Sequence, residues 1–465
     1  MWSLPTARRA IILAGCLGTI YTQFTTSPAT VQFARSLGGG GWHIGILGAL
    51  PQAMLMFQFL AAVLANHLRH RRRAWLTASL VQRTVLIPVA FGPWLLPEVD
   101  AAVWLWALIA ATAADQALGH FGGPLWLSWM GDYLPREGMT RYWGLRHAWM
   151  QWAGAAALLA TALLLFRTGW DTRTAYSVIV GIAVVSGVID LLLFLKVEEP
   201  PASRNAAPRL AQALVAPFQN VNFRKFISYS CFWHFAAMLG APFISMYLLV
   251  EVGMNLYDVL ILWAASWVGG AILSQRVGHW TEEFGNRPML VLCTAAKSVL
   301  MLALVITPRE PTLVFWVMIP ILAIDSALNA GIAIATNGFL LRHSPAENRA
   351  MYIAAGSALA GIVGGVTSVV AGGILSRLLA ALGSEGVQLL GMHFSGFHIL
   401  FLASMLMRVA SIGYARRIQE PESSGARRLA VALVAASPLR LIRLPGQARP
   451  MREETSQERP DRRAA

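Results

Sequence analysis

Long apolar segments recur along almost the whole chain, separated by short polar connections. A helix needs about 20 residues to cross a hydrocarbon layer of roughly 30 Å. The ten-residue alternation of apolar and polar positions that marks a membrane barrel is missing from these segments. The pattern predicts an all-α integral membrane protein with twelve transmembrane helices, over residues 10–33, 42–66, 74–96, 101–130, 147–167, 174–196, 226–250, 256–277, 287–307, 311–341, 350–379 and 397–415.

Composition supports lipid as the solvent of this chain. Hydrophobic residues make up 56% and charged residues 13% of the sequence, whereas soluble domains carry about 25% charged residues. The net charge of +14 is explained by topology and not by nucleic acid, because the cations gather in alternate connections. Such an excess marks cytoplasmic loops, so we expect a cell (inner) membrane protein with both termini cytoplasmic. Among these cations are Arg8, Arg72, Arg141, Arg146, Arg224 and Arg342.

A Pro- and Arg-bearing stretch, VEEPPASRNAAPRL, follows the sixth apolar segment and divides the chain into two halves. We expect an N-terminal six-helix bundle over 1–198, a cytoplasmic linker over 199–223 and a C-terminal six-helix bundle over 224–420. The basic tail over 421–465 is expected to be disordered, with a helix on the lipid surface as the alternative.

The two halves repeat one another. Residues 113–135 align with 323–345, which pairs Asp115 with Asp325 at an offset of 210. Residues 73–86 align with 287–300, which pairs Arg83 with Lys297 at an offset of 214. The alignment of charged positions inside apolar segments is the informative part, because Ala and Leu are common throughout.

Twelve spans in two parallel repeats, with a long central loop, resemble the major facilitator superfamily of secondary transporters. The stretch GHWTEEFGNRPML (278–290) is similar to the loop motif of that family at Gly278, Glu282, Gly285 and Arg287. The resemblance implies that these four residues help to lock the cytoplasmic gate. It also implies two parallel six-helix repeats around a central cavity for a small-molecule substrate.

Two departures from the family pattern are informative. The corresponding loop of the first half, VLANHLRHRRRAWL (63–76), keeps the basic residues but has no acidic residue and no glycine. The fifth segment lacks the Gly-Pro signature of the family's drug and proton antiporters. Uptake is therefore favoured over efflux.

Four charged residues fall near the middle of their spans. Asp115 and Asp325 lie in spans four and ten, and Arg83 and Lys297 lie about 15 Å of helix beyond the start of spans three and nine. Because consecutive antiparallel helices should be neighbours, we predict that Arg83 contacts Asp115 and that Lys297 contacts Asp325. The aspartates could bind a coupling proton, another cation or a polar substrate. Alternatively, the pairs could clamp helices together.

Further polar residues are candidates for the cavity. His234 lies mid-span and titrates near physiological pH, although a hydrogen-bonded core histidine is the alternative. Tyr21 and Gln23 lie in an unusually polar part of the first span, where unpartnered polar groups are costly. Weaker candidates for substrate contacts are Asn329, one turn beyond Asp325, and Gln151 and Trp152 in the fifth span.

No motif for covalent chemistry occurs in the sequence, so we expect neither an enzyme nor a cofactor. His393 and His398 are spaced poorly for a metal site and no third ligand accompanies them, so external loop histidines are favoured. We therefore expect a monomeric secondary active transporter that moves a small polar or organic solute by alternating access, coupled to protons. A transporter-like sensor or assembly partner that does not transport is the alternative.

Overall fold

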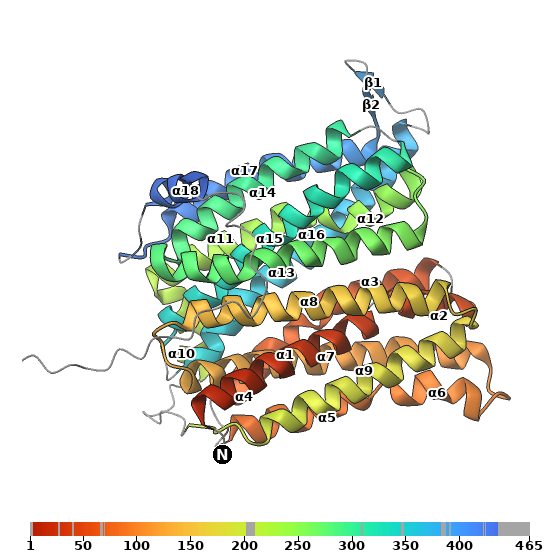
Figure 1. Cartoon of the computed structure of the whole chain (residues 1–465), viewed down its shortest axis with the longest axis horizontal. Helices are drawn as coiled ribbons and strands as arrows, with labels where there is room; N and C mark the ends of the chain where they lie inside the picture. The colour runs from red at the N-terminus through yellow and green to blue at the C-terminus, as the bar shows by residue number, and fades with distance from the viewer. Residues whose placement is uncertain are drawn as a thin grey trace, which may run out of the picture.

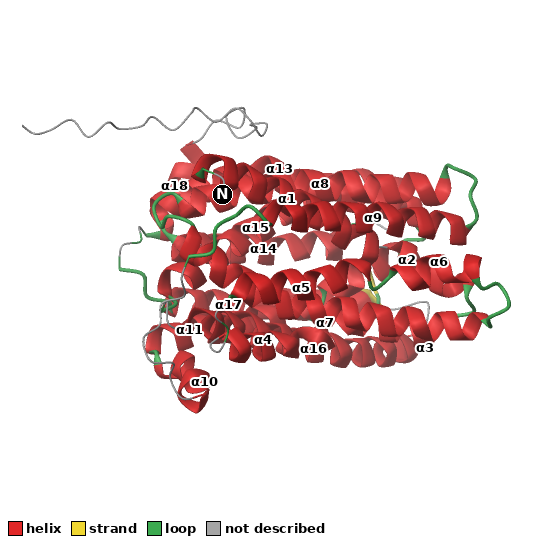
Figure 2. Cartoon of the chain, turned by 90° about the horizontal axis from the view of Figure 1, so that it is seen from below, coloured by secondary structure: helices red, strands yellow, loops and turns green. Residues whose placement is uncertain are grey.

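The chain folds almost entirely into helices, arranged as two bundles side by side (Figure 1). The computed structural model describes residues 3–435, apart from 27, 40, 66–67, 69, 201–209, 308–309, 346–347, 383–386, 390–391, 422 and 424. Seen from below, the axes of the long helices of both bundles lie nearly along one common line (Figure 2). The N-terminus and α10 lie at one end of the bundles, which we call the linker end.

The first bundle contains the elements α1 (Leu4–Thr26), α2 (Pro28–Ser36), α3 (Gly41–Ala53), η1 (Met54–Met56), α4 (Phe57–Ala65), α5 (Arg71–Thr84), α6 (Ile87–Leu95), α7 (Ala101–Tyr133), α8 (Met139–Phe166) and α9 (Thr172–Phe194). The second bundle follows α10 (Leu210–Gln219). It contains α11 (Val221–Met238), η2 (Ala241–Phe243), α12 (Ile244–Met246), η3 (Tyr247–Glu251), α13 (Leu256–Phe284), α14 (Asn286–Ile306), α15 (Pro311–His343), α16 (Arg349–Leu382), α17 (Gly396–Arg417) and α18 (Ala426–Ala435). A hairpin of β1 (Val387–Leu389) and β2 (Met392–Phe394) joins α16 to α17.

Twelve helical segments span the membrane, as the sequence predicted. Eleven of the described segments are long and apolar enough to cross it. The twelfth is α1, which is less apolar because of its Thr, Tyr and Gln side chains and which packs inside the first bundle against α8 and α9. The all-α membrane fold is therefore confirmed.

Among the described residues, two spans are interrupted near prolines. A proline lacks an N–H, and its ring collides with the carbonyl four residues earlier. Accordingly, α5 ends at Thr84, four residues before Pro88, and α11 ends at Met238, four residues before Pro242. These breaks leave irregular backbone at membrane depth, which is tolerated where protein or a water-filled cavity surrounds it.

The two bundles pack together along α8 and α13, which face each other across the boundary (Figure 1). At the linker end their backbones nearly touch, since a Cβ added at Gly144 would lie 2.6 Å from the Cα of Gly278. Towards the other end, the rings of Phe166 and Tyr257 pack edge to face with centroids 6.2 Å apart. The close approach of α8 to α13 therefore requires glycine at both 144 and 278.

The expectation of a disordered tail over 421–465 was wrong for its first part. Residues 426–435 form α18, which packs on α14 and contributes the buried Leu429 to the core of the second bundle. An apolar stripe within a basic segment is enough to hold one short helix against a larger one. Residues 436–465 lie outside the described part of the chain.

Replacing Gly144 with valine should separate α8 from α13 at the linker end, because overpacking a close contact typically costs about 1–3 kcal/mol. The check is a pulsed electron spin resonance distance between nitroxides placed at Glu137 and Glu283. Both positions are exposed and line one pocket at this end. Cys16, Cys231 and Cys293 would first be replaced by serine.

The matched control is Gly413→Val, since a Cβ at this exposed helical glycine meets nothing within 4 Å. We expect a longer distance for Gly144→Val and an unchanged one for Gly413→Val. Equal distance distributions for the two variants would contradict the role given to Gly144.

Candidate functional site

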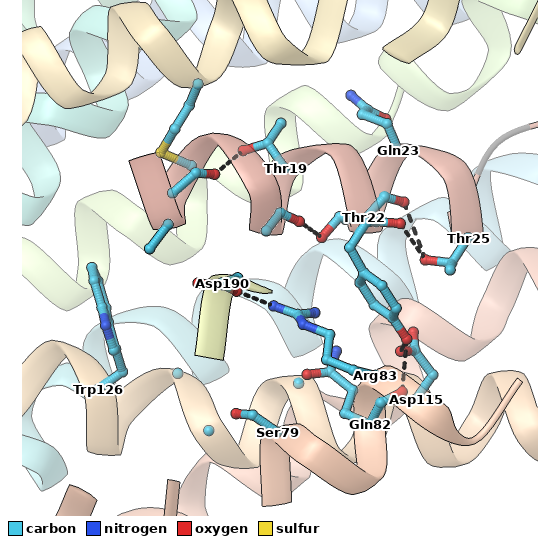
Figure 3. Close-up of a pocket in the computed structure, with 18 of the residues that line it drawn as sticks. Thr19, Thr22, Gln23, Thr25, Ser79, Gln82, Arg83, Asp115, Trp126 and Asp190 are labelled. Atoms are coloured by element: carbon cyan, nitrogen blue, oxygen red, sulfur yellow. Dashed lines mark hydrogen bonds and ion pairs between the residues drawn. The ribbon is translucent and has the colours of Figure 1, made fainter. Parts of the chain in front are cut away.

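A cavity of about 610 Å³ lies within the first bundle. Its lining comes from α1, α5, α7, α8 and α9, and Trp267 of α13 extends it to the second bundle. Figure 3 shows its polar side chains, with Trp126 at one end, Asp115 at the other, and Arg83 and Asp190 between them. The cavity therefore has aromatic, cationic and anionic walls.

Asp115 is buried in this wall, but it does not contact Arg83 as predicted. Its Oδ1 lies 2.6 Å from the hydroxyl of Tyr21, and its Oδ2 accepts a hydrogen bond of 2.9 Å from Gln116. The hydroxyl of Tyr21 also lies 2.7 Å from the carbonyl oxygen of Gln82. Tyr21, predicted as a cavity residue, thus lies between two oxygen acceptors.

Arg83 pairs instead with Asp190 of α9, at 3.0 Å between Nη2 and Oδ2. The reason is the space beside Gly187, where an added Cβ would lie 2.3 Å from the Cδ of Arg83. The guanidinium also lies over the ring of Tyr21, 4.1 Å from its centroid. The prediction considered one neighbour of span three, whereas α5 packs against both α7 and α9.

Asp190 was missed by the sequence reasoning because the repeat alignment offers no acidic partner for it. The sequence nevertheless indicates this residue, since Asp190 is an aspartate inside the apolar run GVIDLLLF. An ionisable residue within a span is by itself a reason to expect a functional or paired group.

Arg146 was assigned to a cytoplasmic connection, and that assignment was wrong. The residue lies inside α8 and lines the cavity. Its guanidinium packs on two indole rings, 4.7 Å from the centroid of Trp126 and 5.2 Å from that of Trp143. The helix begins at Met139, eight residues before the predicted span, which brings this cation into the bundle.

In the second bundle the predicted contact of Lys297 with Asp325 is confirmed. The Nζ of Lys297 lies 2.5 Å from Oδ2 and 3.4 Å from the carbonyl oxygen of Asp325. Arg408 of α17 is a further buried cation that the sequence reasoning missed. It lies 5.5 Å from the ring centroid of Trp233 and 3.4 Å from the carbonyl oxygen of Ala237.

The remaining candidates are dispersed. Gln23 lines the cavity, and Gln151 reaches across to Ser326 at 3.4 Å. His234 is a hydrogen-bonded core histidine, which was the alternative to a coupling role, because its Nδ1 lies 2.8 Å from the carbonyl oxygen of Ser230. Asn329 is exposed on α15, and neither it nor Trp152 lines this cavity.

His398 is not a loop histidine as expected. It is buried in the first turn of α17, where its Nδ1 accepts a hydrogen bond from the backbone N–H of Ser395 at 3.1 Å. No cluster of three metal-ligating side chains occurs among the residues that the structure describes.

At the linker end, charged side chains join the two bundles. Glu282 accepts hydrogen bonds from Arg342 at 2.7 Å and from the backbone N–H of Thr140 at 3.0 Å, the latter across the boundary. Asp132 binds Arg71 of its own bundle at 2.7 Å and Arg349 of the other bundle. Asp132, at the end of α7, therefore supplies the carboxylate that the loop over 63–76 lacks.

The other loop-motif residues lie beside this contact. Gly278 makes the backbone approach to Gly144, and Gly285 has a φ of 101°, which a residue with a side chain rarely adopts. The backbone N–H of Arg287 donates to Glu420 at 2.7 Å, so Arg287 itself is held within the second bundle.

A sequence model of the Major Facilitator Superfamily matches residues 11–369. The chain belongs to the major facilitator superfamily. It is accordingly a multi-pass membrane protein and a secondary transporter of small molecules.

Solved structures of superfamily transporters share this fold. The proton:xylose symporter XylE superposes with a TM-score of 0.67 at 12% identity, over 92% of this chain and 100% of that one. A bacterial homologue of the iron transporter ferroportin, in an outward-facing state, gives 0.63 at 13% identity, over 89% and 99%. The nucleoside transporter NupG gives 0.57 at 12% identity, over 89% and 100%. A search of curated proteins finds no sequence match.

Breaking the buried pair of Arg83 and Asp190 should destabilise the superfamily fold. Removing one partner leaves an uncompensated charge and typically costs about 3–5 kcal/mol. We expect Asp190→Asn to lower the melting temperature of the purified protein clearly, and the double variant with Arg83→Gln to recover much of the loss.

The control is Glu98→Gln, which neutralises an exposed carboxylate in a connection. Thermal unfolding followed by intrinsic fluorescence measures all three variants. If Asp190→Asn melted at the same temperature as Glu98→Gln, the pair would not contribute to stability.

Proposed function

We propose that the protein is a proton-coupled uptake transporter, in which the cavity of the first bundle binds a small polar organic solute and Asp115 carries the coupling proton. Alternating access would expose this cavity to either side of the membrane in turn. The observation that carries the proposal is the hydrogen-bonded chain from Asp115 through Tyr21 to Gln82.

Counting hydrogens in that chain supports a proton on Asp115. The hydroxyl of Tyr21 has one hydrogen but lies within 2.7 Å of two acceptors, the carboxyl of Asp115 and the carbonyl of Gln82. If Asp115 is ionised, one of these two close contacts has no hydrogen. If Asp115 is protonated, it donates to Tyr21 and Tyr21 donates to Gln82, so both contacts are hydrogen bonds. The arrangement thus suits a carboxyl that gains and loses one proton.

The position of this carboxyl also suits coupling. Asp115 lines the cavity together with Gln116, so a solute bound there would be close to the proton site. Arg83 lies over the ring of Tyr21 and is held by Asp190, which connects α1, α5, α7 and α9 around one group. A change in the protonation of Asp115 would therefore act on four helices at once.

The linker end is proposed as the cytoplasmic gate. Its connections hold most of the basic residues of the chain, which supports a cytoplasmic location of this end in an inner membrane. Asp132 with Arg349, and Glu282 with the N–H of Thr140, hold the bundles together there. Both contacts would have to break before the cavity opened to the cytoplasm, and the chain would do so as a monomer because the cavity is built within it.

The pair of Lys297 and Asp325 is proposed as a clamp between α14 and α15. The two side chains satisfy one another, and neither lines the cavity described above. The repeat thus has an exchangeable proton site in one half and a structural ion pair in the other.

A solute screen in proteoliposomes tests this function. Vesicles loaded with the pH indicator pyranine would report proton entry after each addition of a sugar, polyol, amino acid or organic acid, with and without a pH gradient. Solute-dependent acidification that requires the protein would support proton-coupled uptake. Absence of flux for every solute class would favour the alternative, a transporter-like sensor or assembly partner.

Asp115→Asn should abolish pH-driven accumulation of the solute but retain exchange of labelled for unlabelled solute, since the amide cannot carry the proton. Tyr21→Phe should reduce pH-driven uptake by removing the hydrogen-bonded link. Both rates would be measured in the same proteoliposomes.

The control is Tyr257→Phe, which removes a hydroxyl outside the cavity while keeping the ring that packs on Phe166. It should transport as the unmodified protein does. Unchanged pH-driven accumulation by Asp115→Asn would rule out Asp115 as the proton site.

A further inference from the structure

Arg146 makes no hydrogen bond or ion pair within the part of the protein that the structure describes. A guanidinium has five N–H donors, and it stays charged in proteins. Hydrogen bonds and ion pairs of the described residues include none from Arg146, and its Nε is buried without an acceptor. The other cation of the cavity, Arg83, has Asp190. An uncompensated charge in such a place is costly unless a ligand supplies the counter-charge.

The surroundings of Arg146 hold it in a position suited to binding an anion. Trp126 and Trp143 pack on the guanidinium from α7 and α8. Its Nη2 lies against α1 at Gly15, where an added Cβ would lie 2.8 Å away, so glycine leaves the room that this group occupies. Packing on the indoles restricts the side chain, so its remaining N–H groups are held ready for a carboxylate or phosphate, which arginine can bind through two parallel hydrogen bonds.

The charges that line the cavity favour an anion once Asp115 is protonated. Two arginines, Arg83 and Arg146, face two aspartates, Asp115 and Asp190. His120 also lines the cavity, with Nε2 2.8 Å from the carbonyl oxygen of Pro51 and Nδ1 3.4 Å from the amide nitrogen of Gln58, contacts that suit a neutral imidazole. With a proton on Asp115 the four groups carry one net positive charge, which a monoanion would neutralise. Proton and anion would then enter together and leave the loaded cavity electrically balanced.

We propose that the transported solute is a small organic anion whose acidic group binds Arg146, and that it is carried in symport with the proton of Asp115. This inference rests on the proposed function and specifies its substrate class. Gly15 and Tyr21 are six residues apart on α1, so the anion site and the proton site lie about 9 Å apart along the helix. That length suits a solute of a few carbons, with its body along the aromatic wall and hydroxyl groups near Gln116.

A linkage between pH and affinity follows. Neutralising a carboxylate about 9 Å from the anion should strengthen anion binding on the order of tenfold at an effective dielectric constant near 20. By reciprocity, the anion should favour protonation of Asp115 to the same extent.

Binding to the purified full chain tests the proposal without any flux. The probes are matched acidic and neutral solutes: gluconate with glucose, benzoate with benzamide, and glycerol 3-phosphate with glycerol. Quenching of tryptophan fluorescence and the shift in melting temperature would be measured at pH 5.5 and pH 8. We expect at least one anion to bind about tenfold more tightly at pH 5.5, and its neutral partner to bind far more weakly.

Variants of Arg146 and Asp115 test whether these residues bind the anion and the proton. Arg146→Gln should lose at least tenfold in anion affinity, and Arg146→Lys should retain part of it, which separates charge from packing. Asp115→Asn should bind the anion with an affinity independent of pH. Arg173→Gln is the matched control, because Arg173 is exposed and lies outside the cavity. Size-exclusion elution and the ligand-free melting temperature show whether each variant is folded.

Three results would overturn the proposal: no anion of any pair binds, the neutral partner binds equally well, or folded Arg146→Gln binds the anion as the unmodified protein does. These differ from a failure of the proposed function. Intact anion binding without pH-driven flux would leave the anion site and remove the coupled transport. Coupled flux of a neutral solute would support the coupled transport and remove the anion site.

Discussion

The need to compensate charge inside a hydrocarbon layer organises this protein. An ionised group at membrane depth is tolerated when another charge, a hydrogen-bonding group or water satisfies it. Asp190 satisfies Arg83, Asp325 satisfies Lys297, and Tyr21 with Gln116 satisfies Asp115. Each of these contacts joins different helices or fixes a side chain in the cavity wall. In the first bundle, the charged groups that hold the helices together therefore also line the cavity.

The two halves have diverged in how they meet this need. Spans six and twelve both end on a basic residue followed by Glu-Pro, and this alignment places Gly187 opposite Arg408. In the first half, glycine leaves room for Arg83 to pass and reach Asp190 one turn further along α9. In the second half a buried arginine fills the equivalent place, and Lys297 turns to the aspartate of α15. Glycine at this position allows Arg83 to pair with the sixth span, whereas arginine at the equivalent position leaves Lys297 to pair with the tenth span.

The boundary between the halves combines a backbone contact with separable charges. Gly144 and Gly278 allow α8 and α13 to meet closely, while Asp132 and Glu282 bind groups of the opposite bundle at the same end. Close packing gives a well-defined closed arrangement. The ion pair of Asp132 with Arg349 is largely buried, whereas that of Glu282 with Arg342 is partly exposed to solvent. The two bundles are therefore held at this end by backbone packing and by charged contacts together.

The sequence by itself determined the class and plan of this protein. Twelve apolar spans, the break between the halves, the loop motif and the aligned Asp115 and Asp325 all follow from hydrophobic pattern and repetition, which are local properties. Even the contact of Lys297 with Asp325 was predictable, because it joins consecutive helices.

Tertiary structure decided which neighbour each charge meets. Arg83 had α7 and α9 on either side, and the direction of its side chain with the space at Gly187 selected α9. The early start of α8 moved Arg146 from a presumed loop into the cavity between two indoles. Glu282 and Asp132 found partners on helices far away in the chain. Such choices depend on the rotation and packing of whole helices, and the order of residues along one helix does not specify them.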